Sequence, residues 1–127
     1  MKHIVLVCAL GLFACAGAQT KSDQFMEVLA RFHHHLLAGE LDVALQFVAP
    51  SAQEAFLSIH DPARTVNRPE DFNVVTIDTA SDRVLVVVTA DVRKENSLTI
   101  RSVRLQQVWE HRDGRWLLIK EEIVPTR

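Results

Sequence analysis

The regular hydrophobic pattern begins near residue 23, where apolar side chains recur at helical spacing. Between residues 23 and 37, successive apolar residues are four, three and four positions apart, which places them on one face of a helix. This stripe consists of Phe25, Leu29, Phe32 and Leu36. Ser22 or Asp23 is available as the N-cap, and Gly39 is suited to the C-cap.

Two shorter helices are predicted over 41–48 and 52–59, followed by a Pro- and Asp-containing loop over 60–71. From there the apolar period changes to two, and the chain becomes rich in Val, Ile and Thr, which is typical of strands. Asp113-Gly114 is a strong hairpin signal. Four antiparallel strands are therefore predicted, over 72–79, 83–93, 98–111 and 115–124.

The predicted fold class is α+β, with three N-terminal helices packed on a curved four-stranded antiparallel sheet. Apolar residues occur on both faces of the last three strands, whereas three short helices cover only one face. The second face would then meet a partner subunit, the loop 60–71 or a ligand, or it reflects a valine-rich central strand. We expect a homodimer through this sheet face, which gathers Val108, Leu117, Ile119 and Ile123.

The first 18 residues have the layout of a secretory signal peptide. Lys2 precedes an apolar run over 4–13 and the small residues Ala16-Gly17-Ala18. Cleavage after Ala18 would leave one domain over 19–127. Alternatively, cleavage before Cys15, in a lipobox-like context, would leave a lipidated Cys15. Both interpretations predict export to the periplasm or cell envelope.

Composition narrows the classes of partner. The formal net charge of −2 argues against a nucleic-acid-binding surface, and membrane contact is expected only through a lipid on Cys15. The two cysteines, Cys8 and Cys15, lie within or at the edge of the signal segment. The exported domain should therefore have no disulfide, cysteine nucleophile or cysteine-bound metal.

Two segments resemble the NTF2-like superfamily, which includes SnoaL-like and ketosteroid isomerase-like proteins with a cone-shaped α+β fold. They are 38–45 (AGELDVAL) and 113–119 (DGRWLLI), which resemble the helix–glycine–helix junction and the closing hairpin of that superfamily. The resemblance implies the cone fold and dimerisation. It implies no particular catalysis, because the acid and tyrosine constellations of the enzymatic members have no match here.

The most conspicuous polar motif, His33-His34-His35, does not form a metal site on a helix. Metal-binding pairs on helices need spacings of three or four, and only His33 leans towards the apolar stripe. Glu121 and Glu122 are neighbours in a strand and so point to opposite faces, which rules out a joint acid–base pair. No cofactor-binding motif is present.

The remaining candidate site is a small-ligand pocket on the tryptophan face of the sheet, where polar groups meet apolar walls. The residues assigned to it are His33, Gln107, Trp109, Trp116 and Lys120, with Lys120 expected opposite Gln107. The alternative is a core with two tryptophans and polar neighbours at its margin.

We expect an exported, non-catalytic protein that binds a small apolar ligand or acts as an envelope accessory. The alternatives are an isomerase, dehydratase or hydrolase with a His or Asp general base, and a structural lipoprotein acting through its sheet face.

Overall fold

Three α-helices precede a four-stranded antiparallel sheet in the computed structural model, which describes residues 20–125. The α+β class predicted from the sequence is thus confirmed, whereas the cone shape is not. The elements are α1 (Lys21–Leu37), α2 (Leu41–Leu45), the 3-10 turn η1 (Pro50–Ala52), α3 (Gln53–His60), β1 (Asn67–Thr79), β2 (Arg83–Lys94), β3 (Ile100–Arg112) and β4 (Arg115–Val124).

Helix α1 follows the predicted stripe, and all four stripe residues are buried. Its N-cap differs from the prediction: Thr20, rather than Ser22 or Asp23, accepts a hydrogen bond from the Asp23 N–H at 3.1 Å. Gly39 follows the helix with a φ of +75°, a conformation that favours glycine.

The sheet is a simple meander in the order β1-β2-β3-β4. The predicted hairpin is present: Arg112 pairs with Arg115, and Asp113 and Gly114 both have positive φ. Strand β1 begins at Asn67, inside the predicted loop, and includes Pro69. A proline is tolerated there because β1 is an edge strand and its register shifts next to this residue.

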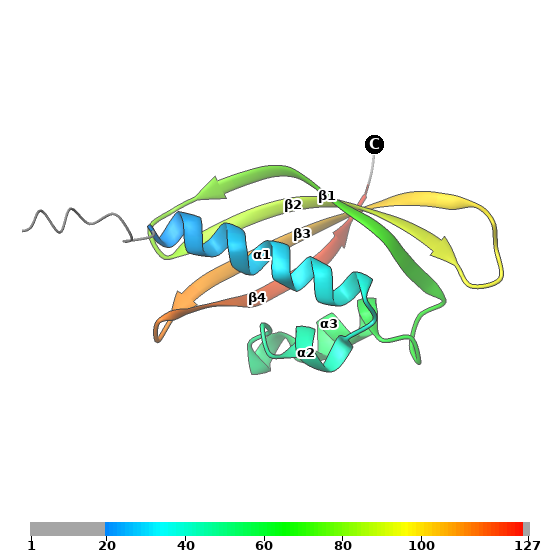
Figure 1. Ribbon diagram of the computed structural model, residues 1–127, viewed down its shortest axis with the longest axis horizontal. Coiled ribbons are helices and arrows are strands. Elements are labelled where there is room, and N and C mark those ends of the chain that lie inside the picture. Colours follow the sequence, from blue (N-terminus) through cyan, green and yellow to red (C-terminus); the bar gives the residue numbers. More distant parts are fainter. Residues whose placement is uncertain (1–19, 126–127) are drawn as a thin grey trace, which may run out of the picture.

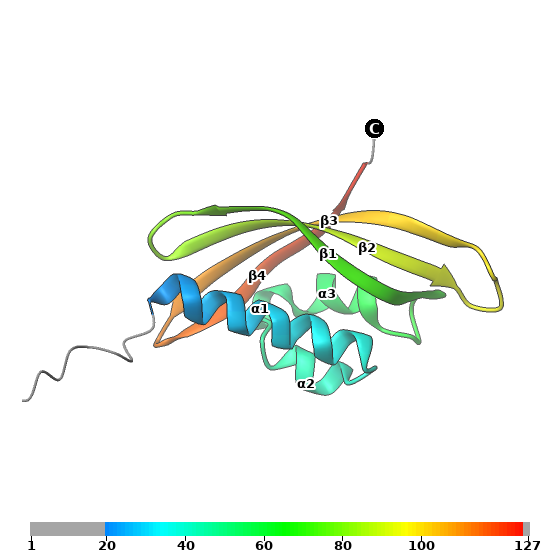
Figure 2. The ribbon, with the colours of Figure 1, turned by 45° about the horizontal axis from the view of Figure 1, so that its top comes forward.

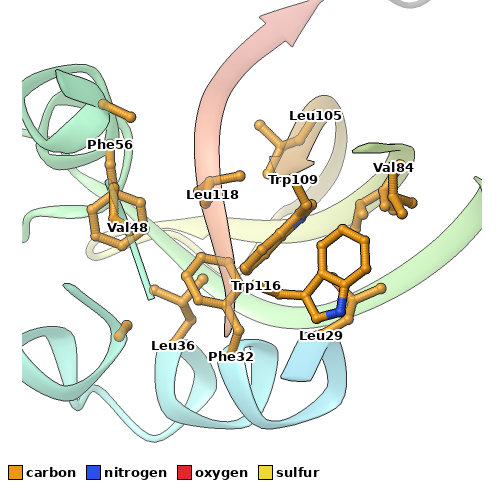
Figure 3. Close-up of a cluster of buried hydrophobic side chains, with 14 of the residues drawn as sticks. Leu29, Phe32, Leu36, Val48, Phe56, Val84, Leu105, Trp109, Trp116 and Leu118 are labelled. Atoms are coloured by element: carbon orange, nitrogen blue, oxygen red, sulfur yellow. The ribbon is translucent and has the colours of Figure 1, made fainter. Parts of the chain in front are cut away.

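All the helices lie on one side of the sheet (Figures 1 and 2). Between them is a core centred on the Phe32 ring, which meets the Trp109 indole edge-on at 5.1 Å (Figure 3). Two backbone hydrogen bonds join the segment after α2 to β4. The Leu118 N–H donates to the Phe47 carbonyl at 2.8 Å, and the Ala49 N–H donates to the Leu118 carbonyl at 2.9 Å.

The β2–β3 hairpin extends beyond the helices, as both ribbon views show. Its half of the sheet therefore has an inner side that the helices cover only in part. Within residues 20–125, no helix has the length and apolar character needed to cross a membrane.

Candidate functional site

A β-bulge in β4 changes which side chains face the helices. The hairpin register holds from Arg112–Arg115 to Trp109–Leu118, but Val108 then pairs with Lys120, and Ile119 is left as the extra residue. A shift of one residue moves every later side chain to the other face. The expected pairing of Lys120 with Gln107 is therefore wrong, and Glu121 lies opposite Gln107 instead.

Glu121 is consequently a buried carboxylate, with only 1% of its side chain exposed. Its Oε2 accepts a hydrogen bond from the Gln107 amide at 2.8 Å, and its Oε1 lies 2.5 Å from the His60 Nε2. The Gln107 Oε1 in turn accepts from the Trp109 indole N–H at 3.1 Å. These two contacts, with Gln107 and His60, offset the cost of removing the carboxylate from water.

The contact with Glu121 constrains where the His60 ring carries its hydrogen. An ionised carboxylate only accepts hydrogen bonds, so a contact with ionised Glu121 requires a hydrogen on the His60 Nε2. In the neutral ring, Nδ1 is then an acceptor, and no described residue donates to it. His60 is the last residue of α3, and the Phe56 ring packs on it with 4.6 Å between centroids. The imidazole is thus held in one orientation.

His60 lines a cavity of about 300 Å³ on the helix side of the sheet. The cavity lies between the end of α3, the start of β1 and the outer halves of β2, β3 and β4. Most of its walls are apolar: Ile59, Pro69, Phe72, Ala90, Val92, Val103, Leu105, Ile123, Val124 and Pro125. Polar groups are contributed by His60, Asn67, Arg101, Ser102 and Arg104.

His33 adjoins this cavity from α1. Its ring stacks on the Phe72 ring at 4.7 Å and 12°, and the side chain is buried, with 8% of the residue exposed. Its Nε2 has no hydrogen-bond partner among residues 20–125. Burial lowers the pKa of His33 to about 4; the Glu121 charge acts in the opposite direction, and His60 lowers it further. The imidazole is therefore neutral at pH 7.

Three of the five residues assigned to the site from the sequence, Gln107, Trp109 and Trp116, face the helices, and His33 is buried on α1. Gln107 donates a hydrogen bond to Glu121, and the Glu121 charge acts on the pKa of His33. Trp109 and Trp116 belong to the hydrophobic core and do not line the cavity beside His60. The Trp116 indole N–H donates to the Lys21 carbonyl at 3.2 Å. Lys120 does not join the group, because its side chain is 63% exposed on the other face.

The sequence interpretation missed His60 and Glu121, which make the central contact. His60 falls in the predicted loop 60–71, and Glu121 was considered only together with Glu122. No turn residue marks the bulge at Ile119, so the sequence offers no signal for the changed register. Among residues 20–125, no group of three or more His, Cys, Asp or Glu side chains is arranged to hold a metal ion.

The predicted signal peptide over 1–18 and the predicted lipid attachment at Cys15 lie outside the described residues.

Comparison with known proteins supports the fold. No protein-family model and no curated protein matches the sequence. A solved structure from Exiguobacterium sibiricum 255-15, which carries the provisional name of a Ca/calmodulin-dependent kinase II association domain, is similar with a TM-score of 0.68 and 14% identity. The match covers 86% of this chain and 95% of that one.

Two further structures are similar. A protein of unknown function with a cystatin-like fold from Nostoc punctiforme PCC 73102 has a TM-score of 0.57 and 20% identity, over 82% of this chain and 91% of that one. A SEC-C motif-containing protein from Rhodopseudomonas palustris has a TM-score of 0.58 and 17% identity, over 87% of this chain and 96% of that one. At these identities the likeness shows the fold alone.

None of these structures bears an NTF2-like or SnoaL-like name. The NTF2-like resemblance given by 38–45 and 113–119 is therefore corrected, and the fold likeness is to the three proteins above. Those two short segments contain a helix junction and a hairpin, which are local features found in many α+β domains.

The depressed pKa of His33 predicts that this residue makes folding sensitive to acid. Unfolded His33 takes up a proton below about pH 6.5, whereas folded His33 does so only near pH 4. Stability contributed by the neutral ring is therefore lost as the pH falls through this window. Between pH 7 and 4.5, the free energy of unfolding should fall by about 2 kcal/mol less in His33→Leu than in the wild type.

Urea unfolding at a series of pH values measures this difference. His34→Leu, at an exposed position on the same helix, is the matched control and should follow the wild type. Equal pH dependence in His33→Leu and the wild type would contradict the prediction.

Proposed function

We propose that this domain binds a small, largely apolar molecule in the cavity beside His60. The observation that carries the proposal is the cavity itself: about 300 Å³, apolar walls and a few convergent polar groups. This combination is typical of small-molecule sites, where apolar walls supply affinity and a few polar groups fix orientation. The cavity supports the ligand-binding or accessory role expected from the sequence. It lies next to the tryptophan face, where the sequence predicted the site.

Filling the cavity should weaken ligand binding. Val103 is half-buried in the wall, so Val103→Phe should weaken binding of the neutral fluorescent probe N-phenyl-1-naphthylamine by about tenfold or more, because the new ring occupies the ligand's volume. Gln106→Phe adds the same ring on the opposite face of β3 and is the control. Equal probe affinity in the wild type and Val103→Phe would contradict a ligand site here.

A second function, general-base catalysis, is favoured by the contact between His60 and Glu121. The carboxylate orients the imidazole through Nε2, which leaves the Nδ1 lone pair free to take a proton. Carboxylate–imidazole pairs of this kind activate water or substrate hydroxyl groups in many hydrolases. In this alternative, His60 is the base and Glu121, Gln107 and Trp109 hold it in position.

A small ester tests this alternative. With 4-nitrophenyl butyrate, His60 would take a proton from water as the water oxygen attacks the carbonyl. The bond to 4-nitrophenolate then breaks and His60 returns its proton, so that 4-nitrophenol and butyric acid are released. His60→Gln should lower the rate by about 100-fold, the lower end of a general-base contribution. His34→Gln should leave the rate unchanged, and a rate in the wild type equal to that in buffer would exclude this activity.

We further propose that the domain acts outside the cytoplasm, in the periplasm or cell envelope. Support comes from the signal-like arrangement of Lys2, the apolar run 4–13 and Ala16-Gly17-Ala18. Lipidation at Cys15 is the alternative form of the same proposal. The absence of cysteine from 20–125 is consistent with a domain that needs no disulfide in an oxidising compartment.

We also propose that two copies associate through the sheet face that carries no helices. Leu85, Val87, Val108 and Ile119 are half-buried there. Charges of both signs surround them, including Glu110 paired with Arg83 and Arg112, so a two-fold interface can match each charge with its opposite. The likeness to a protein named as an association domain also favours assembly.

Charge at this face should separate the copies. Val108→Lys should give a folded monomer, because the lysine is introduced twice at close range, whereas wild type should sediment as a dimer at micromolar concentration. Val86→Lys is the control on the helix side, where the residue is fully buried, and should unfold. A monomeric wild type, or an unchanged dimer in Val108→Lys, would refute the interface.

A further inference from the structure

The residues that line the cavity include arginines and no acidic residue. They are Arg101 and Arg104, and the buried Glu121 carboxylate contacts the cavity residue His60 without itself lining the cavity. The chain as a whole has the opposite balance, with 16 acidic and 14 basic residues. An arginine at the surface of such a cavity favours an anionic ligand.

Arg101 is free to meet such a ligand. Most arginines in the described part of the chain have a carboxylate within 4.0 Å, namely Arg64, Arg68, Arg83, Arg93 and Arg112. Neither Arg101 nor Arg104 has such a partner among residues 20–125. An unpaired guanidinium offers a planar fork of donors that matches a carboxylate.

The register of β3 separates these two arginines. Arg101 lies opposite Val92 and alternates with Val103 and Leu105, so it is on the helix side of the sheet with the apolar walls. Arg104 lies opposite Thr89, on the other face. Arg101 is therefore the cation that stands at the exposed end of the cavity, while His60 lies at its buried end.

The apolar walls determine the rest of the ligand. Phe72 and Val103 are half-buried, and Ile123 is 57% exposed although it lines the cavity. Covering this surface with an apolar chain removes it from water, which favours binding. A volume of about 300 Å³ suits a chain of moderate length rather than a single small ion.

We propose that the ligand is an amphipathic monocarboxylate: Arg101 pairs with the carboxylate, and an apolar chain lies against the cavity walls towards His60. The inference rests on the proposed binding function and adds the chemical class of the ligand. One unpaired guanidinium on this side balances one negative charge, which favours a monoanion over a phosphate dianion. The neutral His33 beside Phe72 adds no second charge.

Decanoate and decan-1-ol test the proposal, because they share the chain and differ in the head group. Isothermal titration at pH 7.4 should show tighter binding of decanoate by wild type. Arg101→Gln should weaken decanoate binding by about tenfold, as expected for the loss of a charged hydrogen bond, and leave decan-1-ol unchanged. Arg101→Lys should lose only part of the affinity for decanoate, since it keeps the charge and lacks the fork.

Lys120→Gln is the matched control, because it removes the same charge from an exposed position on the opposite face. An equal loss of decanoate affinity in Lys120→Gln would overturn the role of Arg101. Equal binding of decanoate and decan-1-ol by wild type would overturn the carboxylate class and leave the binding function standing. Failure of both compounds to bind would overturn the binding function together with the inference.

Discussion

The arrangement around the cavity depends on one constraint: the Glu121 carboxylate lies in the protein interior. A charge in that position costs several kcal/mol unless donors surround it. Gln107 and His60 supply those donors, and they come from β3 and from the last turn of α3. The buried charge therefore ties the end of a helix to the middle of the sheet, and it fixes the orientation of the one imidazole that lines the cavity.

The same constraint separates the molecule into two regions. Around Phe32, Trp109 and Leu118, the helices and the sheet pack together as the buried core (Figure 3). The helical cover ends before the β2–β3 hairpin, where the sheet continues without it (Figure 2). The cavity occupies this transition, so the polar network stands between the core that stabilises the fold and the surface proposed to bind a ligand.

The local sequence pattern predicted the helices and strands better than it predicted the residues of the candidate site. The stripe on α1 and the Asp113-Gly114 turn specify their structure through short-range geometry, and both were confirmed. The bulge at Ile119 is different, because its register depends on burying Glu121 against donors distant in sequence. Side chains alternate with a period of two, so this single extra residue exchanged Lys120 for Glu121. His60 was missed for a similar reason, since its role appears only when α3 meets β4.

The protonation of His60 tests this account most directly, because it reports the contact with Glu121. Ring ¹⁵N chemical shifts of selectively labelled protein at neutral pH distinguish the two tautomers. The account predicts a hydrogen on Nε2, which faces Glu121. A hydrogen on Nδ1 with a bare Nε2 would contradict it, since the carboxylate would then have no donor from α3.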